Sequence, residues 1–308
     1  MRKNLKILIT FAIVILLGMI AFIWLKQTQP SVKNASPQKA AKLAKVKHIN
    51  LVTLGDSLTE GIGDDKGEQG YSGRIAKRIE IQYNIAVNMS NFGKSGDRSD
   101  QIQERLTAQP KFQHAVKQAN VIVLTSGGND LQQSLLKNVF AKTPTDLTTA
   151  VVSEQATYQT KLTRLFHEIR TYNRQAPIFI FGNYNPLFVH FPQREDLNQD
   201  VQRFNTINSH AAKQDKNSYY VDSFDLTFGQ YRSKKMRQSL GQQAVKKATE
   251  DQNSNQAMTA TLMGATHVNN TWISQTDNYH PNNIGYNYMT TQLYHVMRKE
   301  QEKWLIKH

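Results

Sequence analysis

The sequence predicts an α/β protein in which a parallel β-sheet is covered on both faces by helices. Three observations predict this fold class. Short runs of branched apolar residues alternate along the chain with segments of helical periodicity. The runs are mostly apolar and branched, which is typical of strands buried on both faces, and several of them lead into glycine-rich turns. Ligands of such sheets bind at the carboxyl ends of the strands, so functional residues are expected in those turns.

The predicted elements begin near His48. Five apolar runs are predicted to be strands: 49–54, 85–89, 121–125, 178–181 and 219–221. Helical periodicity lies between or after them in 71–83, 99–106, 151–172 and 197–212, and a last helix is predicted over 284–304. The segment 226–274 is rich in Gln, Lys, Asn and Thr and interrupts the alternation. Because connections of this length are uncommon in compact domains, we expect an insertion over or beside the carboxyl edge of the sheet.

The N-terminal region is predicted to attach the domain to a membrane. A short basic tail, 1–6, precedes an apolar run, 7–25, whose only polar side chain is Thr10 and whose length suits a bilayer core. A basic, Pro-containing stretch, 26–47, reads as a flexible tether to the domain at 48–308. A cleaved signal peptide is the alternative, but no small-x-small motif follows the run. We expect an uncleaved anchor and an extracytoplasmic domain, although the basic residues after the run outnumber those before it.

The net charge of +14 does not indicate nucleic-acid binding. Nine of the 38 basic residues lie in the first 47 positions, which contain no acidic residue, so 29 basic and 24 acidic residues remain for the domain. No helix-turn-helix, zinc-finger or ribonucleoprotein pattern is present in the sequence. The absence of cysteine excludes disulfides, thiolate metal sites and a cysteine nucleophile.

Ser57 is the clearest candidate nucleophile. It follows the first predicted strand directly, in Gly-Asp-Ser-Leu-Thr-Glu-Gly, and would lie on the turn at the carboxyl end of a central strand. The pattern differs from the Gly-x-Ser-x-Gly elbow of the α/β-hydrolases, because Thr59 occupies the last glycine position. By itself, Gly-Asp-Ser is also a common turn sequence.

Two further turns at strand ends contain candidate hydrogen-bond donors. One holds Gly96 in Ser-Gly-Asp, and the other holds Asn129 in Gly-Gly-Asn-Asp. Glycine lets the backbone approach a ligand closely, so its N–H and an asparagine amide would offer two fixed donors to a developing oxyanion. Ordinary tight turns, with Asn129 and Asp130 capping the next helix, are the alternative.

Asp277 and His280 form the last motif, Asp-Asn-Tyr-His-Pro, just before the final predicted helix. A carboxylate three residues before a histidine can reach its Nδ1 atom, fix the tautomer and stabilise the imidazolium that forms during proton transfer. The other eight histidines are interpreted as surface or structural residues. No His-Glu-x-x-His or comparable spacing suggests a metal site.

Taken together and in this order, these motifs resemble the SGNH hydrolase superfamily of GDSL-type lipases and acylhydrolases, most closely its exported, membrane-anchored branch in Gram-positive bacteria. The resemblance covers the domain from His48 onward. It implies a flavodoxin-like three-layer α/β/α sandwich with a five-stranded parallel sheet. It also implies a catalytic triad of Ser57, Asp277 and His280, an oxyanion hole of Ser57, Gly96 and Asn129, and no metal or organic cofactor. The long segment before Asp277 departs from the family pattern.

The expected function is therefore hydrolysis of carboxylic esters through an acyl-enzyme on Ser57. Two alternatives remain open. One is an O-acetyl esterase or acyltransferase acting on cell-wall or surface glycan, and the other is a non-catalytic, membrane-tethered binding module. The segment 226–274 either supplies an apolar wall for an acyl chain, through side chains such as Met258, Leu262 and Met263, or packs away from the site. The substrate and the oligomeric state are not indicated by the sequence.

Overall fold

The computed structural model describes residues 46–138, 143–248 and 270–306. All of them belong to the unit Ala44–His308, one of the two units into which the chain divides. The predicted transmembrane run, 7–25, lies outside the described residues. Among those that are described, no helix combines the length and apolar character needed to cross a membrane.

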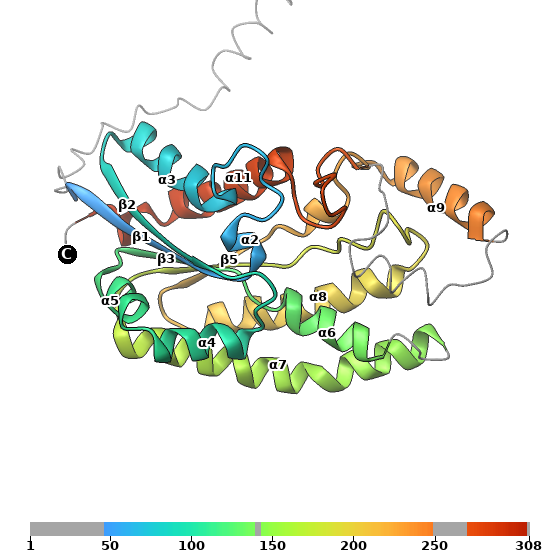
Figure 1. Ribbon diagram of the computed structural model, residues 1–308, viewed down its shortest axis with the longest axis horizontal. Helices are drawn as coiled ribbons and strands as arrows, with labels where there is room; N and C mark the ends of the chain where they lie inside the picture. The colour runs from blue at the N-terminus through green and yellow to red at the C-terminus, as the bar shows by residue number, and fades with distance from the viewer. Residues whose placement is uncertain (1–45, 139–142, 249–269, 307–308) are drawn as a thin grey trace, which may run out of the picture. The chain divides into compact units, whose positions relative to one another are not determined.

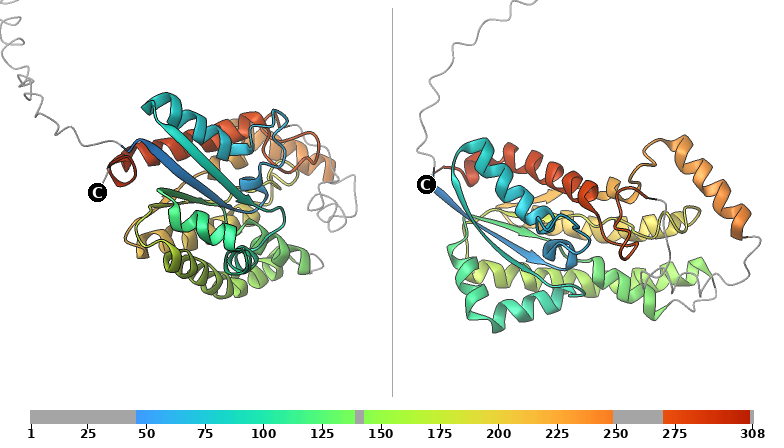
Figure 2. Two further views of the ribbon diagram at one scale, coloured as in Figure 1. Left: turned by 60° about the vertical axis from the view of Figure 1, so that its left-hand side comes forward. Right: turned by 45° about the horizontal axis from the view of Figure 1, so that its top comes forward.

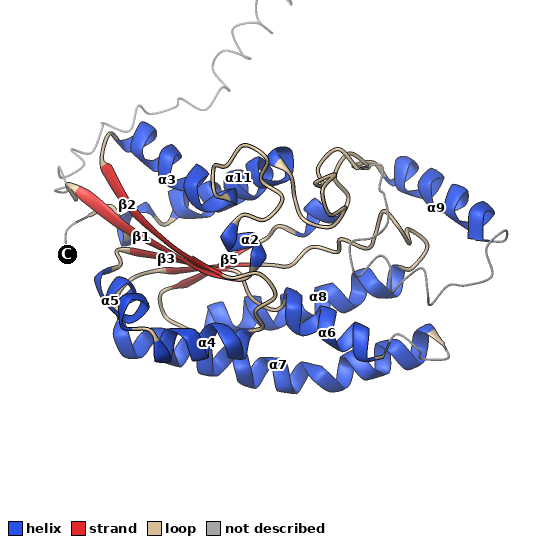
Figure 3. Ribbon diagram, viewed as in Figure 1, coloured by secondary structure: helices blue, strands red, loops and turns tan. Residues whose placement is uncertain are grey.

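The core of the unit is a five-stranded, wholly parallel sheet with the strand order β2-β1-β3-β4-β5 (Figure 3). The strands are β1 (His48–Gly55), β2 (Ala86–Gly93), β3 (Val121–Leu124), β4 (Ile178–Phe181) and β5 (Ser218–Val221). This arrangement confirms the predicted α/β fold. Because every strand runs the same way, all five carboxyl ends lie at one edge of the sheet.

Helices cover both faces of the sheet and form a three-layer sandwich (Figures 1 and 2). One face carries α3 (Gly70–Tyr83) and α11 (Asn283–Lys299). The other carries α4 (Ser99–Ala108), α5 (Pro110–Gln118), α6 (Gly128–Lys137), α7 (Pro144–Tyr172) and α8 (Glu195–Gln214). Side chains alternate along the strands between the two apolar clusters: Val121 and Val123 pack on one side, and Ile122 and Leu124 on the other.

The remaining described elements are short or lie in the predicted insertion. They are α2 (Ser57–Glu60), η1 (Phe224–Thr227), α9 (Lys234–Ala248) and η2 (Gln301–Lys303). Helix α7 begins at Pro144, ahead of the predicted start at 151, because Thr143 and Asp146 form a capping box and Pro144 suits the first helical position. Apolar periodicity alone does not reveal that first, largely exposed turn.

The prediction that all strands are buried on both faces was wrong for the edges of the sheet. Strand β2 has one neighbour, β1, and none of its eight residues is buried. Strand β5 is likewise an edge strand, and only Val221 of its four residues is buried. Edge strands lack a covering neighbour, so the apolar character of 85–89 and 219–221 did not report burial.

A buried ion pair joins the loop after α2 to helices α3 and α11. The Arg74 guanidinium lies 2.6 Å from the Asp64 carboxylate, and the two side chains are 5% and 1% exposed. Arg74 also donates to the side chains of Asn283 and Asn287, at 2.7 and 3.1 Å. Burial acts to raise the pKa of Asp64, but hydrogen bonds from Arg74 and the Gly70 N–H outweigh it, and the pKa lies below its usual range.

We predict that Asp64→Asn lowers the free energy of unfolding at neutral pH by about 2 kcal/mol, because it removes the buried counter-ion of Arg74 and leaves only Glu68, a 39%-exposed carboxylate 3.1 Å away. The pKa of Asp64 is depressed in the folded state, so its stabilisation is present above the usual carboxyl pKa and is lost as the pH falls through the folded value. Urea unfolding of both proteins across pH should show the difference shrinking on acidification.

Asp196→Asn is the matched control, since Asp196 also forms an ion pair, with Arg194, but both side chains are more than 20% exposed. We expect Asp196→Asn to lower the free energy of unfolding by less than about 1 kcal/mol. Equal losses in the two variants would show that the Asp64 pair is no more important than a surface contact.

Candidate active site

Ser57 lies where three strand ends meet. Strand β1 ends at Gly55, whose φ of +152° brings its backbone against Thr125 so closely that an added Cβ would lie 2.2 Å from the threonine Oγ1. Asp56 then caps α2, accepting a hydrogen bond from the Leu58 N–H at 3.0 Å. This strand-turn-helix geometry holds Ser57 at the first helical position, at the carboxyl edge of the sheet.

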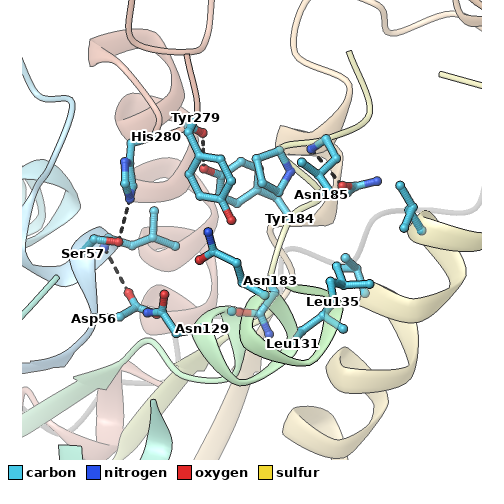
Figure 4. Close-up of a pocket in the computed structure, with 17 residues that line it drawn as sticks. Asp56, Ser57, Asn129, Leu131, Leu135, Asn183, Tyr184, Asn185, Tyr279 and His280 are labelled. Atoms are coloured by element: carbon cyan, nitrogen blue, oxygen red, sulfur yellow. Dashed lines mark hydrogen bonds between the residues drawn. The ribbon is translucent and has the colours of Figure 1, made fainter. Parts of the chain in front are cut away.

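The three residues of the predicted triad form one continuous hydrogen-bonded chain. His280 Nε2 lies 2.8 Å from Ser57 Oγ, and His280 Nδ1 lies 2.7 Å from Asp277 Oδ2 (Figure 4 shows the Ser57 contact). With the Nδ1 proton directed to Asp277, Nε2 is the acceptor for the Ser57 hydroxyl. This is the geometry that a serine nucleophile and its general base require.

The second carboxylate oxygen of Asp277 accepts hydrogen bonds from the backbone of its own loop. Asp277 Oδ1 accepts the backbone N–H groups of Tyr279 and His280, at 3.0 and 2.9 Å, and Asn278 takes a left-handed conformation with φ +56°. Burial acts to raise the pKa of Asp277, but the hydrogen bonds from the His280 ring and backbone outweigh it and lower the pKa. The carboxylate therefore stays ionised opposite the imidazole at neutral and mildly acidic pH.

Contacts from two directions hold the loop that carries His280. The Ser274 N–H donates to the His280 carbonyl at 2.8 Å, and Ile273 forms an isolated antiparallel bridge with Pro281. On the pocket side, the Tyr184 hydroxyl donates to the Tyr279 carbonyl at 2.7 Å. The last residues of the predicted insertion therefore pack against the loop that they precede.

The predicted oxyanion donors lie in two loops that are linked to each other. Gly96 has a φ of +82°, and the Asn129 amide donates to the Asp97 carbonyl at 3.0 Å. Asp130 accepts the Ser99 N–H and hydroxyl at 3.0 and 2.9 Å, which ties the start of α6 to the start of α4. Asn129 lines the same pocket as Ser57. Within the described residues, neither the Ser57 nor the Gly96 N–H donates to another group of the protein.

Asp56 is a site residue that sequence reasoning did not single out. Its carboxylate is buried, accepts the Thr125 hydroxyl at 2.8 Å and lines the pocket beside Ser57. Burial raises its pKa, and the hydrogen bonds from Thr125 and Leu58 only partly oppose that effect. The signal that could have revealed it is its position, immediately before the nucleophile at a helix N-cap.

The pocket at Ser57 has one polar and one apolar part (Figure 4). The polar part includes Asn183 and Asn185, from the segment that follows β4. The apolar part comes from α6, α8 and the loop between β4 and α8. Its residues are Leu131, Leu135, Leu187, Leu197 and Val201. Sequence reasoning had not assigned these residues to the site. None of the described residues of 226–274 lines this pocket, and Met258, Leu262 and Met263 lie outside the described residues.

Comparisons with known proteins agree with this fold and these motifs. Residues 53–288 match the model of the GDSL-like Lipase/Acylhydrolase family. The chain is 29% identical over 264 residues to YpmR, an uncharacterized protein of Bacillus subtilis (strain 168), covering 85% of this chain and 87% of that protein. It is 39% identical over 87 residues to the spore germination lipase LipC of Bacillus licheniformis, covering 28% of this chain and 41% of LipC.

A solved structure extends the likeness to the fold. The lipase Lip_vut3, from a goat rumen metagenome, superposes with a TM-score of 0.59 at 21% identity, covering 82% of this chain and 97% of that one. The parallel sheet, the position of Ser57 and the family match over most of the domain lead to one conclusion. The chain belongs to the GDSL-like lipase/acylhydrolase family of SGNH hydrolases.

Proposed function

We propose that the protein hydrolyses carboxylic esters through an acyl-enzyme on Ser57. The observation that carries this proposal is the unbroken hydrogen-bonded chain from Ser57 through His280 to Asp277. A binding module would have no use for a serine hydroxyl paired to a histidine that a carboxylate orients. The proposal is also in keeping with the family and with the lipases among the similar proteins.

The proposed mechanism assigns one task to each residue. His280 takes the proton of Ser57 as the hydroxyl oxygen attacks the ester carbonyl, and Asp277 stabilises the imidazolium that results. His280 then returns the proton to the departing alcohol, which leaves an ester on Ser57. Water attacks that ester with the same assistance, releasing the acid and restoring the enzyme.

The backbone N–H groups of Ser57 and Gly96 and the Asn129 amide are proposed to bind the oxyanion. Two links, Asn129 to Asp97 and Asp130 to Ser99, join the Gly96 loop to the Asn129 loop and keep those two donors in place before the reaction starts. Preorganised donors stabilise the transition state because they need no reorientation as charge develops. Each such donor contributes roughly 10²- to 10³-fold in rate in related acyl-transfer sites.

The apolar part of the pocket favours an acyl group longer than acetate. Five branched side chains from α6, α8 and the loop between β4 and α8 offer a wall against which methylenes can be buried, at about 0.8 kcal/mol each. This supports an acylhydrolase over an enzyme confined to O-acetyl groups. Acyl transfer to a glycan hydroxyl would use the same acyl-enzyme and differ only in the acceptor.

A fluorophosphonate probe should label the protein at Ser57, because the hydroxyl is activated by His280. Ser57→Ala should abolish both labelling and hydrolysis of p-nitrophenyl esters, as shown by peptide mass spectrometry and by release of nitrophenol. Ser153→Ala is a suitable control, since the Ser153 hydroxyl donates only to a carbonyl of its own helix. Continued labelling and hydrolysis by Ser57→Ala would remove the proposed nucleophile.

Asp277→Asn should lower kcat by roughly 10³- to 10⁴-fold, because an amide can no longer hold the imidazole in the required tautomer. The pKa of Asp277 is depressed, so its carboxylate stays ionised and can keep this role at neutral and mildly acidic pH. Steady-state kinetics with a p-nitrophenyl ester measures the loss of kcat.

Asp215→Asn provides the comparison for this variant. Asp215 pairs with Arg170 next to the amino end of β5, at the edge of the sheet opposite the site. Its loss should reduce stability and leave kcat of the folded protein unchanged. Equal kcat values for the two variants would contradict the proposed role of Asp277.

We also propose that residues 7–25 anchor the protein in the cell membrane with the domain outside the cytoplasm. The apolar run and the absence of a cleavage motif in the sequence support this localisation. Full-length protein should fractionate with membranes, whereas a chain that starts at His48 should not. Protease added to intact cells should digest the domain, and protection of the domain would place it in the cytoplasm instead.

A further inference from the structure

A side-chain amide that lacks a partner within the described part of the chain lies in the wall of the Ser57 pocket. Asn183 follows β4, is 6% exposed, and its Nδ2 atom has no hydrogen-bond partner among the described residues. The backbone of Asn183 is satisfied, since its N–H donates to Asn205 Oδ1 at 2.6 Å and its carbonyl accepts from Asn205 Nδ2 at 2.9 Å. The residue is therefore held firmly while its amide stays unpaired.

The amide is placed where a substrate would pass. In Figure 4, Asn183 extends between Ser57 and the leucines Leu131 and Leu135 of α6, and all four residues line the pocket. The amide packs on the start of α6, where a Cβ added to Gly127 would lie 3.0 Å from Asn183 Nδ2. Asn183 thus stands at the boundary between the reacting hydroxyl and the apolar part of the pocket.

Its polar neighbours in the pocket wall are already engaged. Asn185 Oδ1 accepts the Leu187 N–H at 2.9 Å, and the Asn185 amide donates to Asn198. The Tyr184 hydroxyl is used by the Tyr279 carbonyl. Of the buried side-chain polar atoms that lack a partner in the described part of the chain, only Asn183 Nδ2 belongs to the lining of this pocket. A buried donor is costly when unpaired, so an acceptor that enters the pocket would be favoured there.

We propose that Asn183 donates a hydrogen bond to an oxygen in the acyl chain of the substrate. The preferred substrates are then esters of hydroxy-, alkoxy- or oxo-acids, not of plain alkanoic acids. This inference rests on the proposed function of Ser57. The departing alcohol takes its proton from His280 and so lies on the histidine side, which leaves the side of Asn183 and Leu131 for the acyl group.

Three p-nitrophenyl esters of equal chain length test the proposal: pentanoate, ethoxyacetate and 3-methoxypropanoate. The ether oxygens only accept hydrogen bonds, so they report an N–H donor. Each kcat/KM is divided by the hydroxide-catalysed rate constant of the same ester, to remove differences in intrinsic reactivity. For the full-length protein we expect at least one ether ester to exceed pentanoate by about ten-fold, the factor for one neutral hydrogen bond.

Asn183→Leu should abolish that preference, because leucine has a similar size and no donor. Asn217→Leu is the control: the Asn217 amide donates to the Gln175 carbonyl beside the amino end of β5, away from the pocket. Asn217→Leu should keep the preference for an ether ester over pentanoate. Fluorophosphonate labelling of Ser57 verifies that each variant is folded. If Asn183→Leu does not fold, Asn183→Ala takes its place in the same test.

The possible outcomes separate this inference from the function on which it rests. Equal normalised values for all three esters in the wild type, or a preference that persists in Asn183→Leu, would overturn the role of Asn183. Hydrolysis of none of the esters above the level of Ser57→Ala would instead overturn the proposed ester hydrolase.

Discussion

The close approach of three strand ends around Gly55 is the constraint on which the site depends. An added Cβ at Gly55 would lie 2.2 Å from Thr125 Oγ1, and one at Gly93 would lie 2.1 Å from the Glu60 nitrogen. The end of β1 can therefore lie against Thr125, after β3, and helix α2 against the end of β2, only because glycine occupies these positions. Thr59 and Thr125 then join by a hydroxyl contact of 2.7 Å, so the turn that carries Ser57 rests on both neighbouring strands.

His280, the proposed general base, comes from a loop that is remote from Ser57 in the sequence. Ser57 and His280 are separated by 223 positions, so their contact forms only when α11 has packed on the sheet. The Arg74 network fixes that helix by joining it to the loop that follows Ser57. The turn after β1 therefore positions Ser57, the packing of α11 positions His280, and the two side chains meet in one hydrogen bond. Residues outside the pocket are needed for this geometry.

The fold and the proposed triad could be predicted from the sequence because both leave local signals. The central strands are mostly apolar, and Ser57, Asn129 and His280 each lie in a short motif at a strand or helix end. The pocket wall left no such signal. Asn183, Leu135 and Val201 come from three separate segments, and their neighbours in space are set by tertiary packing. A lone asparagine after a strand is typical of a turn, and only the structure shows that the Asn183 amide nitrogen is buried and has no partner among the described residues.

The carboxyl groups near Ser57 show how burial distributes charge across the site. Hydrogen bonds outweigh burial at Asp277 and lower its pKa, whereas burial dominates at Asp56 and Asp130 and raises theirs. Negative charge is thus most stable beside the imidazole, where a positive charge would form in the proposed mechanism. It is disfavoured near Ser57 and Asn129, where a second negative charge would oppose the proposed oxyanion. Opposed shifts of this kind suit chemically identical groups to different tasks, and here they follow from the balance of burial against hydrogen bonds at each carboxyl group.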